Sequence, residues 1–370
     1  MKRTSRTAAA ATAALTSLSL PLSAFTLLST ALLSTALVSV ALVSTAGCGG
    51  GAGQSTVAPS TEPARYVVTE IVSLPYRAVF VDRNRDGYLV GSKALGIQYD
   101  DGLVVSPDGT VTVIPNPAGG FTVTYVEAIN NVGQVVGTSI GPNDIGATGF
   151  VYDIRSGQTT AIPGLTSPRA INDAGKVVGT DLRGNIRKGM VYDIATGTSE
   201  ELPRTTTDIH NSVPGNFEPF GITGGGLVAG VLFRDLALYD VNTKALKRVS
   251  PTPDTDRSFS SVSGVTESGK VPGNDRRGSG SGLTFRRYIY DIASGRKSYL
   301  PDEPQTGGLR TVINEAGAVV LGSSGDLSVY QNGQLKKVSE GLSAEDLAKW
   351  QIEDAFAIDE SGVIYATAAE

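Results

Sequence analysis

AINNVGQVVGT (128–138) and AINDAGKVVGT (170–180) are nearly the same stretch of sequence written twice, and this stretch decides the fold. Clear further copies are VINEAGAVVLG (312–322) and AIDESGVIYAT (357–367). Weaker copies are VDRNRDGYLVG (81–91), GITGGGLVAG (221–230) and VTESGKVPG (265–273). Every copy has one glycine in the same place: Gly87, Gly133, Gly175, Gly226, Gly269, Gly317 and Gly362. Successive glycines are 42 to 51 residues apart, and a period in this range is typical of four-stranded propeller blades.

Each copy has the pattern of a tight β-hairpin. The residue three positions before the glycine is always Asn, Asp or Thr: Asn84, Asn130, Asn172, Thr223, Thr266, Asn314 and Asp359. Such a residue at the first position of a type I turn, with glycine at the fourth, predicts a hairpin in which the glycine is left-handed. The positions before the turn alternate broad aliphatic and small side chains, as expected for the crowded innermost strand of a propeller.

A second motif follows most hairpins and supplies two more strands. It reads GFVYDIRSGQTTAIP (149–163), GMVYDIATGTSEELP (189–203), LALYDVNTKALKRVSP (236–251), RYIYDIASGRKSYLP (287–301) and LSVYQNGQLKKVS (327–339). We interpret its Tyr-Asp pair as strand packing followed by a carboxylate that caps the turn. Hairpin and motif together predict four strands per blade.

The predicted fold is all-β, a seven-bladed β-propeller over residues 65–370. The last hairpin is not followed by a second motif, and the repeat region opens with a lone outer strand, RYVVTEIVSLP (65–75). We therefore predict that strand 66–74 completes the blade of the C-terminal hairpin 354–368 and closes the ring. Closure of this kind protects a sheet edge from other chains.

The combination of AIND-x-G-x-VVG with FVYD resembles the extracellular HAF repeat of bacteria. The resemblance covers most of the chain after residue 65, although the fourth and fifth copies match it poorly. It implies an exported β-propeller. It implies no established activity and no catalytic residues.

Residues 1–47 are predicted to be an export segment, because Lys2, Arg3 and Arg6 precede a long uncharged stretch. Thr45-Ala46-Gly47-Cys48 resembles a lipobox, and this resemblance implies cleavage before Cys48 and lipidation of that residue. A membrane-spanning anchor is the alternative, since the uncharged stretch is long enough to cross a bilayer. Residues 48–64 are predicted to be a flexible linker. The expected location is the cell envelope or cell surface, and the outer membrane in a Gram-negative cell.

The composition limits the partners. Without its three N-terminal basic residues the chain has a formal charge of −8 instead of −5, which argues against nucleic acid as a ligand. Cys48 is the only cysteine, so an internal disulfide is excluded. We expect a monomer that contacts the membrane through the lipid on Cys48.

Catalytic motifs are absent from the sequence. His210 is the only histidine, so a histidine-rich metal site cannot form, and with Cys48 assigned to the lipid no Cys–His pair remains. Asp82, Asn84 and Asp86 follow the pattern at the start of a calcium loop, but Lys93 stands where its bidentate glutamate belongs. The alternative to calcium at this position is a decorated turn, that is, a type I turn that carries charged side chains and binds no ion. We therefore expect no cofactor other than calcium, and we expect no enzyme.

The working face is predicted from the connections between strands. Long insertions lie between the second and third strands of a blade and between blades, at the end opposite the tight hairpins, where binding residues often gather. The candidate ligand-binding residues are His210, Phe217, Arg257, Phe259, Arg276, Arg277 and Trp350. The favoured function is a binding or scaffold module for a protein or glycan. A polysaccharide-active lyase or glycosidase and a purely structural surface protein are the alternatives.

Overall fold

The protein is described by a computed structural model over residues 35–43, 65–95, 98–141, 146–183, 187–205, 215–233, 235–249, 259–277, 284–301, 311–322 and 327–369. These residues all belong to one compact unit, residues 33–370. The predicted linker and Cys48 lie outside the described residues, and of the predicted export segment only residues 35–43 are described.

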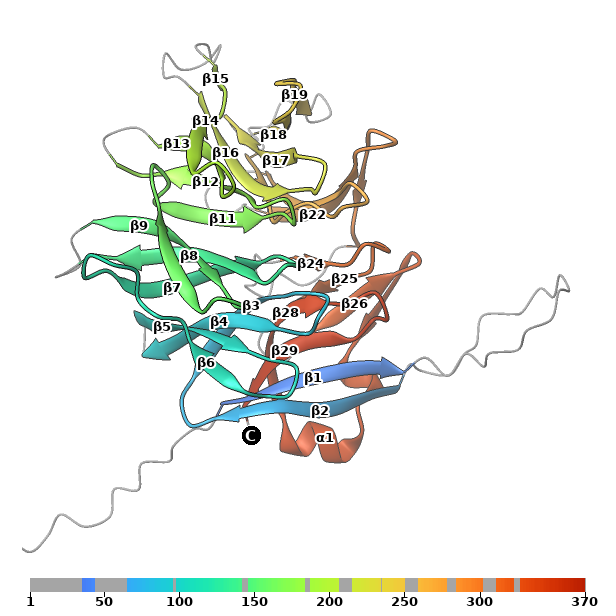
Figure 1. Cartoon of the computed structure of the whole chain (residues 1–370). Coiled ribbons are helices and arrows are strands. Elements are labelled where there is room, and N and C mark those ends of the chain that lie inside the picture. Colours follow the sequence, from blue (N-terminus) through green and yellow to red (C-terminus); the bar gives the residue numbers. More distant parts are fainter. Residues whose placement is uncertain are drawn as a thin grey trace, which may run out of the picture. The chain divides into compact units, whose positions relative to one another are not determined.

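Six antiparallel sheets are each built from consecutive strands (Figure 1). The first is β3 (Ala78–Arg83), β4 (Leu89–Leu95), β5 (Gln98–Val105) and β6 (Val111–Val113). The second is β7 (Thr122–Ile129), β8 (Gln134–Ile140), β9 (Ala147–Asp153) and β10 (Gln158–Ile162). The third is β11 (Ser167–Ile171), β12 (Lys176–Asp181), β13 (Lys188–Asp193) and β14 (Thr198–Glu201).

The remaining three of these sheets follow the same order. The fourth has five strands, β15 (Arg204–Thr205), β16 (Gly215–Ile222), β17 (Leu227–Leu232), β18 (Asp235–Asp240) and β19 (Leu246–Val249). The fifth is β20 (Phe259–Val262), β21 (Lys270–Arg277), β22 (Thr284–Asp291) and β23 (Arg296–Tyr299). The sixth is β24 (Val312–Ile313), β25 (Val319–Leu321), β26 (Ser328–Gln331) and β27 (Gln334–Lys337).

The seventh sheet is composite. It joins the C-terminal hairpin, β28 (Gln351–Ile358) and β29 (Ile364–Ala369), to β1 (Thr35–Val43) and β2 (Arg65–Leu74) in the order β2-β1-β29-β28. The all-β propeller prediction is confirmed. The predicted count of seven blades is wrong, because consecutive strands make six blades and the seventh sheet does not repeat their construction.

The ring closure also differs from the prediction, because a further strand lies between β2 and the C-terminal hairpin. β2 belongs to the same sheet as the C-terminal hairpin, but it pairs with β1, and β1 in turn pairs with β29. β1 lies within the predicted export segment 1–47, so part of that segment is a blade strand in this structure. The physical reason is that β2 supplies only a fourth strand, and a third strand is needed to connect it to β29.

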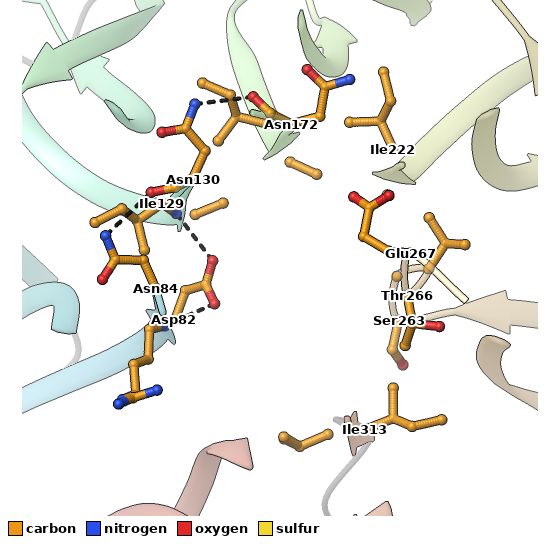
Figure 2. A pocket seen from close by; sticks show the side chains of 18 of the residues that line it. Asp82, Asn84, Ile129, Asn130, Asn172, Ile222, Ser263, Thr266, Glu267 and Ile313 are labelled. Carbon is orange, nitrogen blue, oxygen red and sulfur yellow. Dashed lines mark hydrogen bonds between the residues drawn. The ribbon is translucent and has the colours of Figure 1, made fainter. Parts of the chain in front are cut away.

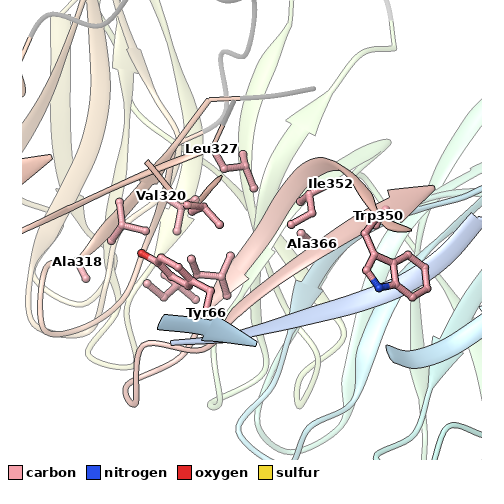
Figure 3. Packing of buried hydrophobic residues seen from close by; sticks show 12 residues of the cluster. Tyr66, Ala318, Val320, Leu327, Trp350, Ile352 and Ala366 are labelled. Atoms are coloured by element: carbon pink, nitrogen blue, oxygen red, sulfur yellow. The ribbon is translucent and has the colours of Figure 1, made fainter. Parts of the chain in front are cut away.

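Apolar clusters bridge neighbouring sheets and hold them face to face. One cluster joins Val136 and Val151 of the second sheet to Val177 and Met190 of the third. In Figure 3, Tyr66 of β2 packs with residues of the sixth sheet and of the C-terminal hairpin. Burial of the Tyr66 ring raises the pKa of its hydroxyl to about 12.

The hairpin turns have the predicted geometry. In all seven copies the glycine N–H donates to the backbone oxygen of the Asn, Asp or Thr three residues earlier, at 2.9–3.2 Å. The glycine φ angles lie between 73° and 89°, a region that side chains disfavour. The side-chain oxygen of the first turn residue accepts the N–H four residues on, as Asn172 does from Lys176 at 2.9 Å.

The turn asparagines also connect the blades, which the sequence pattern did not predict. Asn84 Nδ2 donates to the backbone oxygen of Asn130 at 3.3 Å, and Asn130 Nδ2 donates to that of Asn172 at 3.0 Å. Asn172 Nδ2 continues to Thr223 O at 2.9 Å. Asn314 Nδ2 likewise reaches Asp359 O at 2.9 Å. One amide therefore closes its own hairpin and binds the next blade.

A short helix precedes the C-terminal hairpin. α1 (Ala344–Lys349) begins after Ser343, whose hydroxyl accepts the Asp346 N–H at 3.0 Å. In the part of the chain that is described, no helix has the length and apolar character to cross a membrane.

Replacing Asn172 by Thr should separate the two roles of this amide. Thr keeps an oxygen for the hairpin, as Thr223 and Thr266 do, but it lacks the donor to Thr223 O. We expect Asn172→Thr to lower the free energy of unfolding by about 1 kcal/mol. Asn172→Ala should lower it further, because the buried hairpin N–H also loses its acceptor. Urea unfolding of both variants measures this, and equal stability of Asn172→Thr and the unchanged chain would contradict the inter-blade role.

Candidate functional site

A cavity of about 430 Å³ lies where the first strands of the sheets end in their hairpin turns (Figure 2). Residues of six of the sheets line it through β3, β7, β11, β16, β24 and β28, and the fifth sheet contributes the turn region after β20. We call it the axial pocket. Asn84, Asn130 and Asn172 stand on one side of it, opposite Ser263, Thr266 and Glu267.

A bulge in the first strand delivers side chains to the pocket. The pairing of β7 with β8 skips Glu127, and that of β11 with β12 skips Arg169. Both residues line the pocket, and their side chains pair at 3.2 Å. Bulges commonly redirect a side chain in this way.

The glycine of the VVG motif makes room for this bulge. Gly137 and Gly179 lie opposite the bulged segment, and a Cβ at either position would come within 2.2 Å of a backbone oxygen of the first strand. Only glycine fits such an approach.

The second residue of each hairpin turn forms a belt around the pocket rim. Asn131 accepts the Arg85 N–H at 2.9 Å, and Asp173 accepts the Asn131 N–H at 2.8 Å. Further round, Glu267 accepts the Gly224 N–H at 2.7 Å, and Glu315 accepts the Glu267 N–H at 2.8 Å. Glu360 accepts the Glu315 N–H at 2.9 Å. Each of these side chains is thus fixed by the backbone of the preceding blade.

Four members of this belt are carboxylates: Asp173, Glu267, Glu315 and Glu360. Within the described ranges none of the four forms an ion pair with Lys, Arg or His. In all, seven carboxylates and three arginines line the axial pocket. One arginine, Arg169, is paired with Glu127, and Arg83 lies over the Tyr365 ring with its guanidinium carbon 4.4 Å from the ring centre. The rim is therefore acidic.

Thr311 adds a polar group without a partner. The residue is 4% exposed, and among the described residues its hydroxyl oxygen has no hydrogen-bond partner. It lines the pocket. A buried hydroxyl that makes no bond costs free energy, which a bound ligand would recover.

Asp359 at the pocket edge is held in its charged form. Burial raises the pKa of this carboxyl, but hydrogen bonds from Ser361, from the Val363 N–H and from the Tyr365 hydroxyl outweigh burial, so its pKa lies below its usual value. Burial also raises the pKa of Tyr365 to about 12. The negative charge of Asp359 consequently persists through neutral pH.

The predicted calcium ligands have other contacts. Asp82 accepts the Arg83 N–H at 2.8 Å and, across blades, the Ile129 N–H at 3.0 Å. Asn84 Oδ1 accepts the Tyr88 N–H at 3.0 Å, while Asp86 is exposed. Among the residues described here, no cluster of three or more His, Cys, Asp or Glu could hold a metal ion. Calcium at Asp82, Asn84 and Asp86 stays a prediction.

The predicted loop residues are only partly placed. Phe217 lies in β16, not in a loop, and is buried in the core beside Tyr239 with ring centres 6.4 Å apart. Trp350 is buried against the sixth sheet and the C-terminal hairpin. Phe259, Arg276 and Arg277 lie in strands of the fifth sheet. His210 and Arg257 lie outside the described residues.

The four belt carboxylates were missed by the sequence interpretation, which placed the ligand at the opposite end of the blades. Asp82 and Asn84 also line the pocket, but they were named only as calcium ligands. A signal for the four carboxylates exists in the sequence. The position directly after the first turn residue (Asn, Thr or Asp) carries Asp173, Glu267, Glu315 and Glu360, and turn packing does not require an acid there.

Comparisons with known proteins support the fold. No protein-family model matches the chain, and no curated protein matches it. The structure is similar to the β-propeller domain of the trilobed protease from Pyrococcus furiosus, at 14% identity and a TM-score of 0.51, covering 78% of this chain and 91% of that one. It is also similar to an oligogalacturonate lyase in complex with manganese, at 13% identity and a TM-score of 0.51, covering 76% of this chain and 85% of that one. A putative TolB from Agrobacterium tumefaciens matches at 11% identity and a TM-score of 0.47, covering 73% of this chain and 89% of that one. At these identities the likeness shows a β-propeller and nothing finer.

Calcium binding can be tested without disturbing the blades. If the ion binds, millimolar calcium should raise the melting temperature, and Asp86→Ala should remove the rise. Asp86 is a better target than Asp82, whose loss also breaks the bond to Ile129. A melting temperature that calcium leaves unchanged would favour the decorated turn.

Proposed function

We propose that the chain is an extracytoplasmic β-propeller binding module whose ligand presents a positively charged group to the axial pocket. The ligand is a protein segment with basic side chains or a glycan with amino groups. The module is held at the cell envelope through a lipid on Cys48. The fold itself is common to many activities, so the proposal rests on the pocket.

The acidic rim is the observation that carries the proposal. Four carboxylates face one cavity, and none of the four has a cationic partner among the described residues. A recess lined by one sign of charge concentrates ions of the opposite sign. An anionic polymer such as a nucleic acid or a pectin fragment would be repelled, whereas ammonium and guanidinium groups would be attracted.

The belt also holds these carboxylates in place before any ligand arrives. Glu267 receives the Gly224 N–H on both oxygens, at 2.7 and 2.8 Å. Glu315 receives two N–H groups, from Glu267 and Ser268. Ordering a side chain on binding costs about 0.5–1.5 kcal/mol, and a fixed carboxylate avoids that cost. This favours binding over a structural role alone.

Binding is tested with defined probes. We expect tetralysine and a glucosamine tetramer to bind at low salt, measured by calorimetry, and the fully N-acetylated tetramer not to bind. Raising the salt to physiological strength should weaken binding, because the rim is exposed to solvent.

Matched variants locate the site. Glu267→Gln/Glu360→Gln keeps an oxygen for each backbone N–H but removes two charges. We expect it to weaken binding about tenfold, from two exposed ion pairs of about 0.7 kcal/mol each. Glu70→Gln/Glu345→Gln removes the same charge from exposed positions outside the pocket lining and should bind normally.

Arg276→Ala/Arg277→Ala probes the predicted long-loop face. It should leave binding unchanged. If this variant weakens binding and the pocket variant does not, the long-loop face is the site and the proposal is wrong. Failure of both cationic probes would contradict it as well.

A further inference from the structure

The composite seventh sheet contains a strand that differs in origin from every other strand of the fold. β1 comes from residues 35–43, inside the predicted export segment, and its last residue lies five positions before Cys48. In the other sheets the third strand directly follows the second along the chain. Cleavage before Cys48 would separate β1 from β2.

β1 is paired along both of its edges. Its partners run from Thr35↔Ala369 to Val40↔Ile364 on β29, and from Thr35↔Leu74 to Val43↔Arg65 on β2. Both pairings are antiparallel. It follows that β2 and β29 run parallel to each other and lie two strand spacings apart, about 9.6 Å.

β2 cannot simply move over to replace β1. Leu74 at its end is buried in the cluster that includes Phe80 and Phe356, and Tyr66 at its start is buried beside Trp350 and Ile352. Only three residues separate Leu74 from the start of β3. An antiparallel pairing with β29 would require β2 to reverse direction and withdraw both side chains from the core.

The linker is a poor replacement. Residues 48–64 contain Pro59 and Pro63 and four glycines, and proline cannot donate to a strand ladder. Loss of β1 would therefore leave a gap one strand wide, bounded by unpaired edges of β29 and β2. Such edges recruit extended segments.

We propose that the seventh sheet is a strand-accepting slot between β29 and β2. Before processing it holds residues 35–43. After cleavage at Cys48, which the proposed lipid anchoring requires, it binds an extended, uncharged segment of a partner protein that runs antiparallel to both edges. The chemistry of that segment is set by β1, TALVSVALV, which has small and aliphatic residues and no charge.

Complementation in trans tests the slot on the full chain. Val38→Pro/Ser39→Pro removes two N–H groups from the middle of β1, and we expect the melting temperature to fall by roughly 6 °C or more. A peptide of residues 35–43 with a solubilising lysine tail should restore it. The same peptide with both prolines should not, and Ala9→Pro/Ala10→Pro in the chain should leave the melting temperature unchanged.

Cysteine trapping gives a measurement that does not depend on folding of the proline variant. In a Cys48→Ser background, Ala36→Cys/Ala368→Cys should form a disulfide, because these residues are direct partners. Ala36→Cys/Ala366→Cys is displaced by two residues and should not. Absence of the first disulfide, or a peptide that fails to restore the proline variant, overturns the slot.

Whether the slot opens in the native protein is tested by the mass of the protein's N-terminal peptide. An N-terminus at a lipid-modified Cys48 supports the proposal, whereas one ahead of Thr35 overturns the partner-binding step. Neither result affects ligand binding at the axial pocket, which is measured separately.

Discussion

At four of the seven hairpins one amide side chain provides the contact between blades on which the ring depends. An asparagine at the first turn position accepts a hydrogen bond from its own hairpin and donates one to the backbone of the next blade. The two functions need an acceptor and a donor on one short side chain. This explains why these turns use asparagine, at Asn84, Asn130, Asn172 and Asn314. Thr223 and Thr266 keep only the acceptor, and the bonds of Glu267 and Glu315 join those blades instead.

The same turns also build the pocket. Because the first residue of the turn binds the neighbouring blade, the second residue is brought over the neighbour's turn, where its side chain can accept a backbone N–H. The bulge opposite the VVG glycine then directs Glu127 and Arg169 toward the axis. Contacts between blades and the chemistry of the pocket thus arise from one eleven-residue motif. A binding surface made from contacts between blades is rigid without needing inserted loops.

The features of the fold that repeat from blade to blade were predictable from the sequence. Glycine spacing, turn residues and the two strand motifs were sufficient for an all-β propeller, and the left-handed glycines are where the pattern placed them. Prediction from the sequence failed where contacts join segments that are far apart along the chain. The Asn172–Thr223 bond spans 51 residues, and no local rule reveals it. Phe217 looked like a loop residue because a turn-rich segment precedes it, yet it lies in β16. β1 was missed because a hydrophobic export segment and a buried strand have the same composition.

Inter-blade hydrogen bonds fix the acidic rim before a ligand arrives, and amide hydrogen exchange by NMR is a direct measurement of this. Gly224, Glu267 and Glu315 lie in turns whose amides would exchange rapidly if they were open to water. The account predicts that these three amides are protected to a degree comparable with strand amides such as that of Val177. Exchange as fast as that of Arg155, an exposed residue in a turn of the second blade, would contradict the claim.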